Sequence, residues 1–295
     1  FILALFGGYF QFFAGFNPFG FRAIDNLPRL TLTFHDKLLL GSYIARLFPL
    51  LLALIIYHFA EKKIGIFLIV IFLILSDVLT FISGERTAFA LIFMSTILVI
   101  FLIQQYRMIR IFTFIFSILI ITIIAFTSEK IMQRNIEHTM NQIGVTNGKI
   151  NAFSPQHTEH FISAFKMFID RPILGHGPNS FRLICNNEEY VSKYSCSTHP
   201  HNTIFQLLSE TGIIGTFYFF CFSLFFIYKL IKDKFFRNKK NYSKLNDYQI
   251  CLFICVLLTL VPFTPTQNFF NNWINVVYYL PAGFIIHSFN SVRNK

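Results

Sequence analysis

The sequence predicts an all-α membrane protein, a polytopic bundle of transmembrane helices with one large polar loop outside the bilayer. The 295 residues are 54% hydrophobic and only 13% are charged, whereas soluble domains carry roughly 25% charged residues. Several apolar runs reach the ~20 residues that a helix needs to cross a bilayer. The 41 phenylalanines suit a lipid-facing surface better than a compact soluble core. These observations exclude the soluble globular class.

Eight apolar segments are expected to form the membrane helices. Their ranges are 1–16, 38–59, 64–82, 86–104, 110–127, 203–231, 249–265 and 272–290. No internal repeat and no low-complexity linker divides the chain, so we expect a single membrane domain, 1–295. The chain opens inside the first apolar segment, without a basic start. We therefore expect this domain to be incomplete at its N-terminus.

The net charge of +11 is distributed in a pattern that indicates orientation. Basic residues concentrate in four joints, at 61–63, 107–110, 232–244 and 293–295. If every segment crosses once, these joints share one side, which the positive-inside rule makes cytoplasmic. The loop 128–202 then lies on the opposite side. Because orientation explains the charge, we expect no nucleic-acid partner.

The loop 128–202 is the only sizeable polar region, and its Pro and Gly residues are turn signals. Residues 160–169 have the apolar spacing of a helix, which we expect to lie on the membrane surface. Cys185 and Cys196 lie in this loop, where disulfides can form, and both a bridge and free thiols are left open. A zinc site of these cysteines with His199 and His201 is disfavoured, because the His-x-His pair is cramped.

Histidines are concentrated in the same loop, at His157, His160, His199 and His201. Histidine titrates near neutral pH and can move a proton. His201 directly precedes Asn202, the expected N-cap of the next helix, and the start of a helix favours anions. A water-facing residue beside a helix end is the alternative interpretation for His201. The number of histidines on one side favours a functional site.

Two further kinds of side chain complete the predicted site. Arg86 lies where a segment enters the membrane from the loop side, and its guanidinium suits the oxygens of a diphosphate. A simple interface anchor is the alternative for Arg86. Glu210, about two turns into the helix after Asn202, is expected to orient His201 or a substrate hydroxyl. Arg182 is placed with the substrate-binding residues.

Several motifs resemble those of the O-antigen ligase and polymerase family. Residues 164–177 (AFKMFIDRPILGHG) resemble its loop helix and its P-x-x-G-x-G turn. Residues 199–202 (HPHN) and 207–215 (LLSETGIIG) resemble its H-N … L-x-E-x-G-x-x-G signature, and residues 83–88 (SGERTA) resemble its G-x-R-T motif. Residues 41–43 and 268–273 also look similar to the family. The resemblance covers roughly residues 30–290, with the motifs in the family's order.

The resemblance implies a GT-C-like fold and a glycosyltransferase of the bacterial inner membrane with a periplasmic active site. Its members take a glycan from undecaprenyl diphosphate. The family's arginine falls on Arg86 and its loop histidine on His201, which are therefore the expected catalytic residues. The remaining candidates, His157, His160, His199, Glu210 and Arg182, are expected to bind substrate. His157 lies where many members have an arginine, so a histidine is expected to replace that diphosphate contact.

The resemblance leaves the acceptor open. A ligase passes the glycan to lipid A-core, and a polymerase passes it to another lipid-linked repeat unit. We expect no cofactor and no required metal, because the sequence shows neither a nucleotide-binding loop nor a cluster of carboxylates. A transporter or flippase for a lipid-linked sugar is the alternative from another class, although transporters usually place ionisable groups near the bilayer midplane. Here the spans 64–82, 86–104 and 110–127 contain almost no charge, with Asp77 as the exception. A structural membrane protein with a sensing loop is the third alternative.

Overall fold

The computed structural model describes residues 1–18, 30–34, 39–59, 62–142, 144–146, 149–151, 153–191, 194, 196–236, 245–262 and 264–293. The predicted basic joints at 61–63, 232–244 and 293–295 therefore lie partly outside the described residues. The helices in chain order are α1 (Ile2–Ala14), η1 (Leu32–Phe34), α2 (Leu40–Phe59), α3 (Lys63–Ile82), α4 (Arg86–Leu102), α5 (Arg107–Thr127), α6 (Glu129–Met132), η2 (Gln133–Glu137), α7 (His138–Gln142), α8 (Pro155–Asp170), α9 (Phe181–Ile184), α10 (Thr203–Ile231), η3 (Lys232–Phe236), α11 (Asp247–Thr259) and α12 (Asn272–Arg293).

The architecture is α-helical, as predicted, and each of the eight apolar segments contains one helix. Within the part of the chain that the structure describes, four helices are long and apolar enough to cross a membrane, namely α2, α3, α5 and α10 with its extension to Phe235. The helices α1, α4 and α11 are apolar but shorter. The chain is therefore a polytopic helical membrane protein. One antiparallel hairpin of β1 (Gly144–Thr146) and β2 (Lys149–Asn151), with Val145 opposite Ile150, was not predicted.

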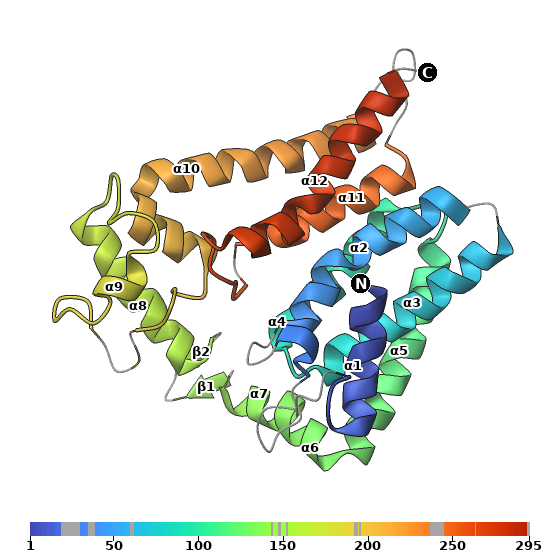
Figure 1. Ribbon diagram of the computed structural model, residues 1–295, viewed down its shortest axis with the longest axis horizontal. Coiled ribbons are helices and arrows are strands. Elements are labelled where there is room, and N and C mark those ends of the chain that lie inside the picture. The colour runs from blue at the N-terminus through green and yellow to red at the C-terminus, as the bar shows by residue number, and fades with distance from the viewer. Residues whose placement is uncertain are drawn as a thin grey trace. The chain divides into compact units, whose positions relative to one another are not determined.

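The chain forms two compact units (Figure 1). Unit 1 comprises residues 1–139, 233–259 and 280–295, and unit 2 comprises residues 140–232 and 260–279. Unit 2 thus contains most of the predicted polar loop together with α10. That 1–295 acts as one membrane domain remains a prediction.

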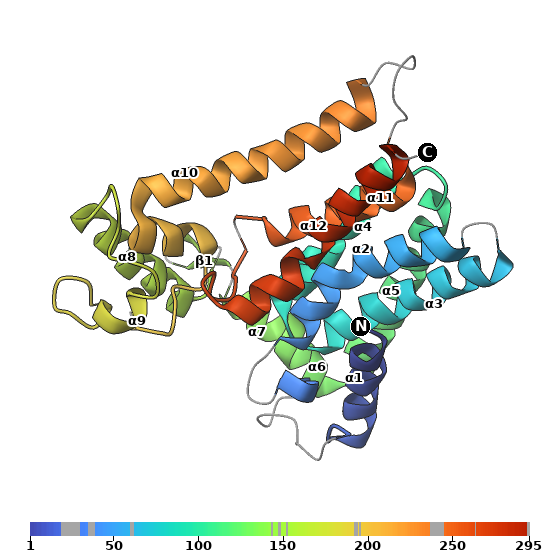
Figure 2. The same cartoon turned by 45° about the horizontal axis from the view of Figure 1, so that its top comes forward.

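Unit 1 is built around α2, which packs against α3, α4 and α11, while α3 packs against α5 (Figures 1 and 2). Most of α2 is buried, from Leu40 to Ile56. By contrast, α5 leaves a broad apolar face exposed, including Phe112, Ile115 and Phe126. A helix that is apolar on its exposed face is typical of contact with lipid.

Unit 2 packs α8 against the first part of α10, and α9 also contacts α10. Ser154 caps α8, because its hydroxyl accepts a hydrogen bond from the His157 amide, and Pro155 occupies the first helical position, where its missing N–H is not needed. The buried face of α8 includes His160, Phe161 and Met167. The predicted loop helix at 160–169 is therefore confirmed, and it starts earlier than the apolar spacing indicated.

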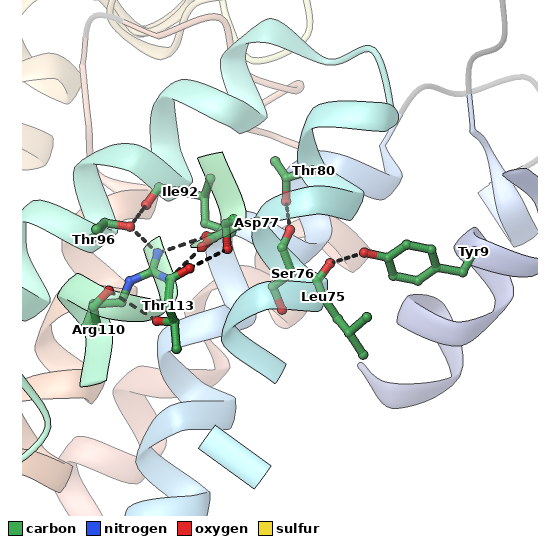
Figure 3. Close-up of polar contacts among 10 residues, drawn as sticks. Tyr9, Leu75, Ser76, Asp77, Thr80, Ile92, Thr96, Arg110 and Thr113 are labelled. Atoms are coloured by element: carbon green, nitrogen blue, oxygen red, sulfur yellow. Dashed lines mark hydrogen bonds and ion pairs between the residues drawn. The ribbon is translucent and has the colours of Figure 1, made fainter. Parts of the chain in front are cut away.

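A buried ion pair connects the helices of unit 1 (Figure 3). The Arg110 guanidinium on α5 donates to both carboxylate oxygens of Asp77 on α3, at 2.7 and 2.9 Å, and also to the Thr96 hydroxyl on α4. Its carbon Cζ lies 5.3 Å from the ring centre of Phe48 on α2 and 5.5 Å from that of Phe114. Arg110 and Asp77 are each 1% exposed. One guanidinium therefore touches side chains from four helices.

Replacing Arg110 by Met should strongly destabilise the protein, because the carboxylate of Asp77 would remain buried without its partner. Removing one member of a buried ion pair costs about 3–5 kcal/mol. The measurement is unfolding by SDS titration in mixed micelles, followed by circular dichroism. The matched control is Arg107→Met at the exposed start of the same helix, and an equal loss in both variants would contradict the prediction.

Candidate functional site

Arg86 is the first residue of α4 and is partly exposed. The preceding turn depends on Gly84, whose φ of 74° lies in the left-handed region that favours glycine. The Ser83 hydroxyl donates to the Thr80 carbonyl at 2.8 Å and so ties this turn to the end of α3. The turn therefore fixes the position of Arg86 at the start of α4.

Glu85 joins two motifs that the sequence analysis identified separately, residues 41–43 and 83–88. Its carboxylate accepts hydrogen bonds from the amides of Gly41, at 2.7 Å, and Ser42, at 3.0 Å. These amides belong to the first turn of α2, where N–H groups lack partners within the helix. A Cβ atom on Gly41 would collide with the Ser83 hydroxyl. Glycine at position 41 therefore allows the close approach that brings Glu85 to α2.

Burial raises the pKa of the Glu85 carboxyl to about 7. The hydrogen bonds from Gly41 and Ser42 and the nearby charge of Arg46 act in the opposite direction, because they favour the ionised form. The residue next to Arg86 is thus an acid that titrates near neutral pH. No local sequence signal indicates this role of Glu85, since its partners lie more than forty residues away.

The four histidines of the predicted site lie together in unit 2. The ring centre of His201 lies 4.1 Å from that of His199, 5.4 Å from that of His160 and 5.5 Å from that of His157. His157 and His160 come from α8, and His199 and His201 from the segment before α10. His160 and His199 are buried, and His157 and His201 are partly exposed. The cluster therefore reaches the surface of its unit.

Hydrogen bonds to α10 and to Thr266 hold the segment that carries His199 and His201 in place. Asn202 caps α10, as predicted, because its side-chain oxygen accepts from the Ile204 amide at 2.9 Å and the Phe205 amide at 3.2 Å. The Thr266 amide donates to the His201 carbonyl at 2.9 Å. His201 has a φ of 57°, a left-handed conformation that is uncommon outside glycine and is often found at functional sites.

Hydrogen bonds and burial set the protonation of this segment. The Nε2 atom of His199 lies 3.0 Å from the Thr266 carbonyl, which only accepts, so Nε2 carries the proton. Burial, followed by neighbouring positive groups, lowers the pKa of His199 to about 4 and that of His201 to about 3. The residue type alone predicts histidines that titrate near neutral pH. The structure instead keeps these two neutral at pH 7.

Glu210 anchors the turn of the loop that contains Gly175 and Gly177, here termed the Gly-rich turn, to α10. Its carboxylate accepts from the amides of Asn179, at 2.9 Å, and Phe181, at 3.0 Å. Its carbonyl also accepts from the Gly177 amide at 2.8 Å. Gln206, one turn earlier, donates to the Glu210 carboxylate at 3.2 Å. These contacts assign the Glu210 carboxylate to the protein's own backbone, and its predicted role toward substrate stays a prediction.

Arg182 belongs to a polar network that the sequence analysis recognised only in part. Its guanidinium donates to the Asn179 side-chain oxygen at 3.0 Å, and Asn268 donates to the same oxygen at 3.0 Å. Asn268 in turn accepts from Gln206 at 2.7 Å. Arg182 is exposed, and its charge contributes to the lowered pKa of His199, which places it near the histidine cluster. Asn179 and Gln206 were missed, because single amides in a loop or helix carry no sequence signal.

Cys185 and Cys196 form a disulfide with a Cα–Cα distance of 5.2 Å. The bridge resolves the alternative left open by the sequence, and it removes both thiols from any zinc site with His199 and His201. Within the described residues, no group of three His, Cys, Asp or Glu side chains has the arrangement of a metal site. The segment just after Cys196 bears Ser197, whose hydroxyl lies 3.1 Å from His201 Nε2. The disulfide therefore lies next to the histidine cluster in the chain.

Replacing Glu85 by Gln should remove one pH dependence of stability. Between its ordinary pKa of 4.5 and its folded pKa of about 7, Glu85 keeps a proton in the folded protein that the unfolded chain releases. The free energy of unfolding should therefore fall as pH rises through this window, and Gln should abolish that fall. The measurement is the midpoint of thermal unfolding in lipid nanodiscs from pH 4 to 8. Identical pH profiles of the two proteins would contradict the prediction.

Comparisons with known proteins found a matching family and a similar protein. The model of the family described as O-antigen ligase matches residues 70–220, a range that contains Arg86 and all four histidines of the cluster. A protein of Rickettsia conorii named as a candidate polysaccharide ligase is 31% identical over 93 residues, which is 30% of this chain. The matched part of the chain covers 21% of that protein's length, or about a fifth of it. No solved structure matches. Because the family model covers just over half of the chain, the protein belongs to the O-antigen ligase family.

Proposed function

We propose that this protein transfers a glycan from undecaprenyl diphosphate to lipid A-core at the periplasmic face of the bacterial inner membrane. Family membership supports the polysaccharide-ligase type of reaction. The observation that carries the proposal is the cluster of four histidines within one unit, partly exposed and next to the cap of α10. Grouped imidazoles of this kind provide hydrogen bonds to a sugar or phosphate and sites for a proton.

The proposed reaction is a single displacement at the anomeric carbon of the donor sugar. The acceptor hydroxyl oxygen forms the new bond to this carbon, while the bond from the carbon to the diphosphate oxygen breaks and its electron pair leaves with the diphosphate. The proton of the acceptor hydroxyl passes to His201, the proposed base. A bound diphosphate would raise the pKa of the nearby imidazoles, because an opposite charge favours the protonated form. The neutral His201 of the free protein then becomes a better base once donor is bound.

Arg86 is proposed to bind the diphosphate and to stabilise the charge that develops on it. A guanidinium donates several hydrogen bonds in a fixed geometry and stays protonated at any relevant pH. Arg182, exposed near His199, and His157 and His160 on α8 are proposed as further contacts to substrate. Arg86 belongs to unit 1 and the histidines belong to unit 2. The contacts of Arg86 and of the histidine cluster are therefore tested by separate variants.

Replacing Arg86 by Ala should reduce glycan transfer by ~10²–10³, the usual cost of removing one well-placed charge donor. His201→Ala should also lose transfer, because the acceptor would lose its proposed base. The measurement is release of undecaprenyl diphosphate by purified protein supplied with lipid-linked donor and acceptor. Arg171→Ala is the matched control, since the exposed Arg171 side chain forms a long ion pair with Asp170, at 3.8 Å, and has no proposed role in transfer. Full activity of Arg86→Ala would refute the diphosphate contact.

A deletion strain should show which acceptor the enzyme uses. If it is a ligase, surface lipopolysaccharide on a gel should be reduced to bare core, while glycan accumulates on the lipid carrier. Lipopolysaccharide capped by single repeat units would instead identify a polymerase. An unchanged carrier pool with unchanged lipopolysaccharide would contradict both forms of the proposal.

A further inference from the structure

The helix α10 is longer than a membrane requires. With its extension to Phe235 it contains 33 residues, which corresponds to about 50 Å of helix. The hydrocarbon core of a bilayer is ~30 Å thick. Some of α10 must therefore lie outside the hydrocarbon, or the helix must be strongly tilted.

A break in the backbone divides α10 at Gly212, which has a φ of 63° and a ψ of −164° (the bend is visible in Figure 1). The loop turn at 172–174 fills this break. The Ile213 amide donates to the Pro172 carbonyl at 2.8 Å, and the Ile214 amide donates to the Ile173 carbonyl at 3.4 Å. A Cβ atom at Gly212 would collide with the Ile173 carbonyl. The loop turn and the break therefore lie at the same level along α10.

The environment of α10 changes at the same residue. Before the break, its side chains Gln206, Ser209 and Glu210 are buried within unit 2. After the break, large apolar side chains are exposed, including Ile213 at 57% and Phe217 at 62%. Residues 213–231 form about 28 Å of helix, which matches the thickness of a bilayer core. This change indicates that lipid begins just after Gly212.

The loop continues this apolar surface. On α8, the side chains of Ile162, Phe165 and Ile169 are exposed, and their spacing places them on one face of the helix. Ile173 and Leu174, exposed at 63% and 70%, extend that face to the level of the break. These five residues are termed the loop stripe. Exposed Lys166 and Arg171 lie beside it in the sequence, as is usual for helices that lie in a lipid headgroup region.

We propose that the loop stripe is a membrane-binding surface that lies in the headgroup region of the lipid bilayer, with Gly212 at the membrane boundary. The partner is the lipid surface itself. Ile173 and Leu174 enter the bilayer beside the start of the lipid-facing part of α10. The first two turns of α10 and the histidine cluster then stand on the water side, directly above the lipid.

Fluorescence quenching in lipid nanodiscs that hold a single copy of the full chain tests this proposal. An environment-sensitive NBD label is attached to one cysteine at a time, at position 169, 174, 188 or 217, after Cys221, Cys251 and Cys255 are replaced by Ala. Position 217 is the lipid-exposed reference and position 188, an exposed Glu on the loop, is the aqueous reference. The quenchers are iodide in water and a spin-labelled lipid.

The labels at 169 and 174 should resemble the label at 217, with blue-shifted emission, strong quenching by the lipid probe and loss of iodide quenching. The label at 188 should show the opposite. Iodide quenching at 169 and 174 equal to that at 188 would overturn the proposal. Protection of 174 that appears only when two copies share a nanodisc would assign the stripe to a second copy and would also overturn it. No substrate is needed, so this result is independent of whether the protein transfers a glycan.

Discussion

The carboxylate of Glu210 holds the elements on which the candidate site depends. It accepts hydrogen bonds from the amides of Asn179 and Phe181, and these bonds hold the Gly-rich turn against α10. The same docking brings the Pro172 and Ile173 carbonyls to the amides that Gly212 leaves without helical partners. A buried carboxylate is costly unless it is well hydrogen-bonded, and here the bonds come from another segment. The helix break and the loop that carries Arg182 therefore stabilise each other.

The histidine cluster shows how burial changes the chemistry of a group that is ordinarily half-charged near neutral pH. Four protonated imidazoles at ring distances of 4.1–5.5 Å would repel one another strongly. Lowered pKa values keep His199 and His201 neutral and avoid that repulsion in the free protein. An anionic substrate would raise the pKa values of His199 and His201, because a nearby negative charge favours the protonated imidazole. His199 and His201 therefore gain positive charge more readily when a negative group is present.

Much of the fold could be predicted because its causes are local. The apolar segments predicted eight of the helices, and Asn202 was recognisable as a cap from its place before an apolar helix. The histidines could be assigned to one site because they crowd into one loop. Contacts between distant segments were not predictable. Two examples are the hydrogen bond from the Gly41 amide to Glu85 and the ion pair between Arg110 and Asp77. The residues that flank a carboxylate in the sequence do not reveal which distant amide or guanidinium will bind it.

The disulfide between Cys185 and Cys196 has a consequence for the order of assembly. In the chain-entropy description, a disulfide that closes a loop of this size raises the free energy of the unfolded chain by about 3 kcal/mol. The next residue, Ser197, contacts His201, so the crosslink lowers the entropy lost when that segment becomes ordered. Disulfides form and persist in oxidising compartments. In the chain-entropy description, the segment that carries His201 is therefore more costly to order before the bridge has formed, which ties assembly of the candidate site to the oxidation of Cys185 and Cys196.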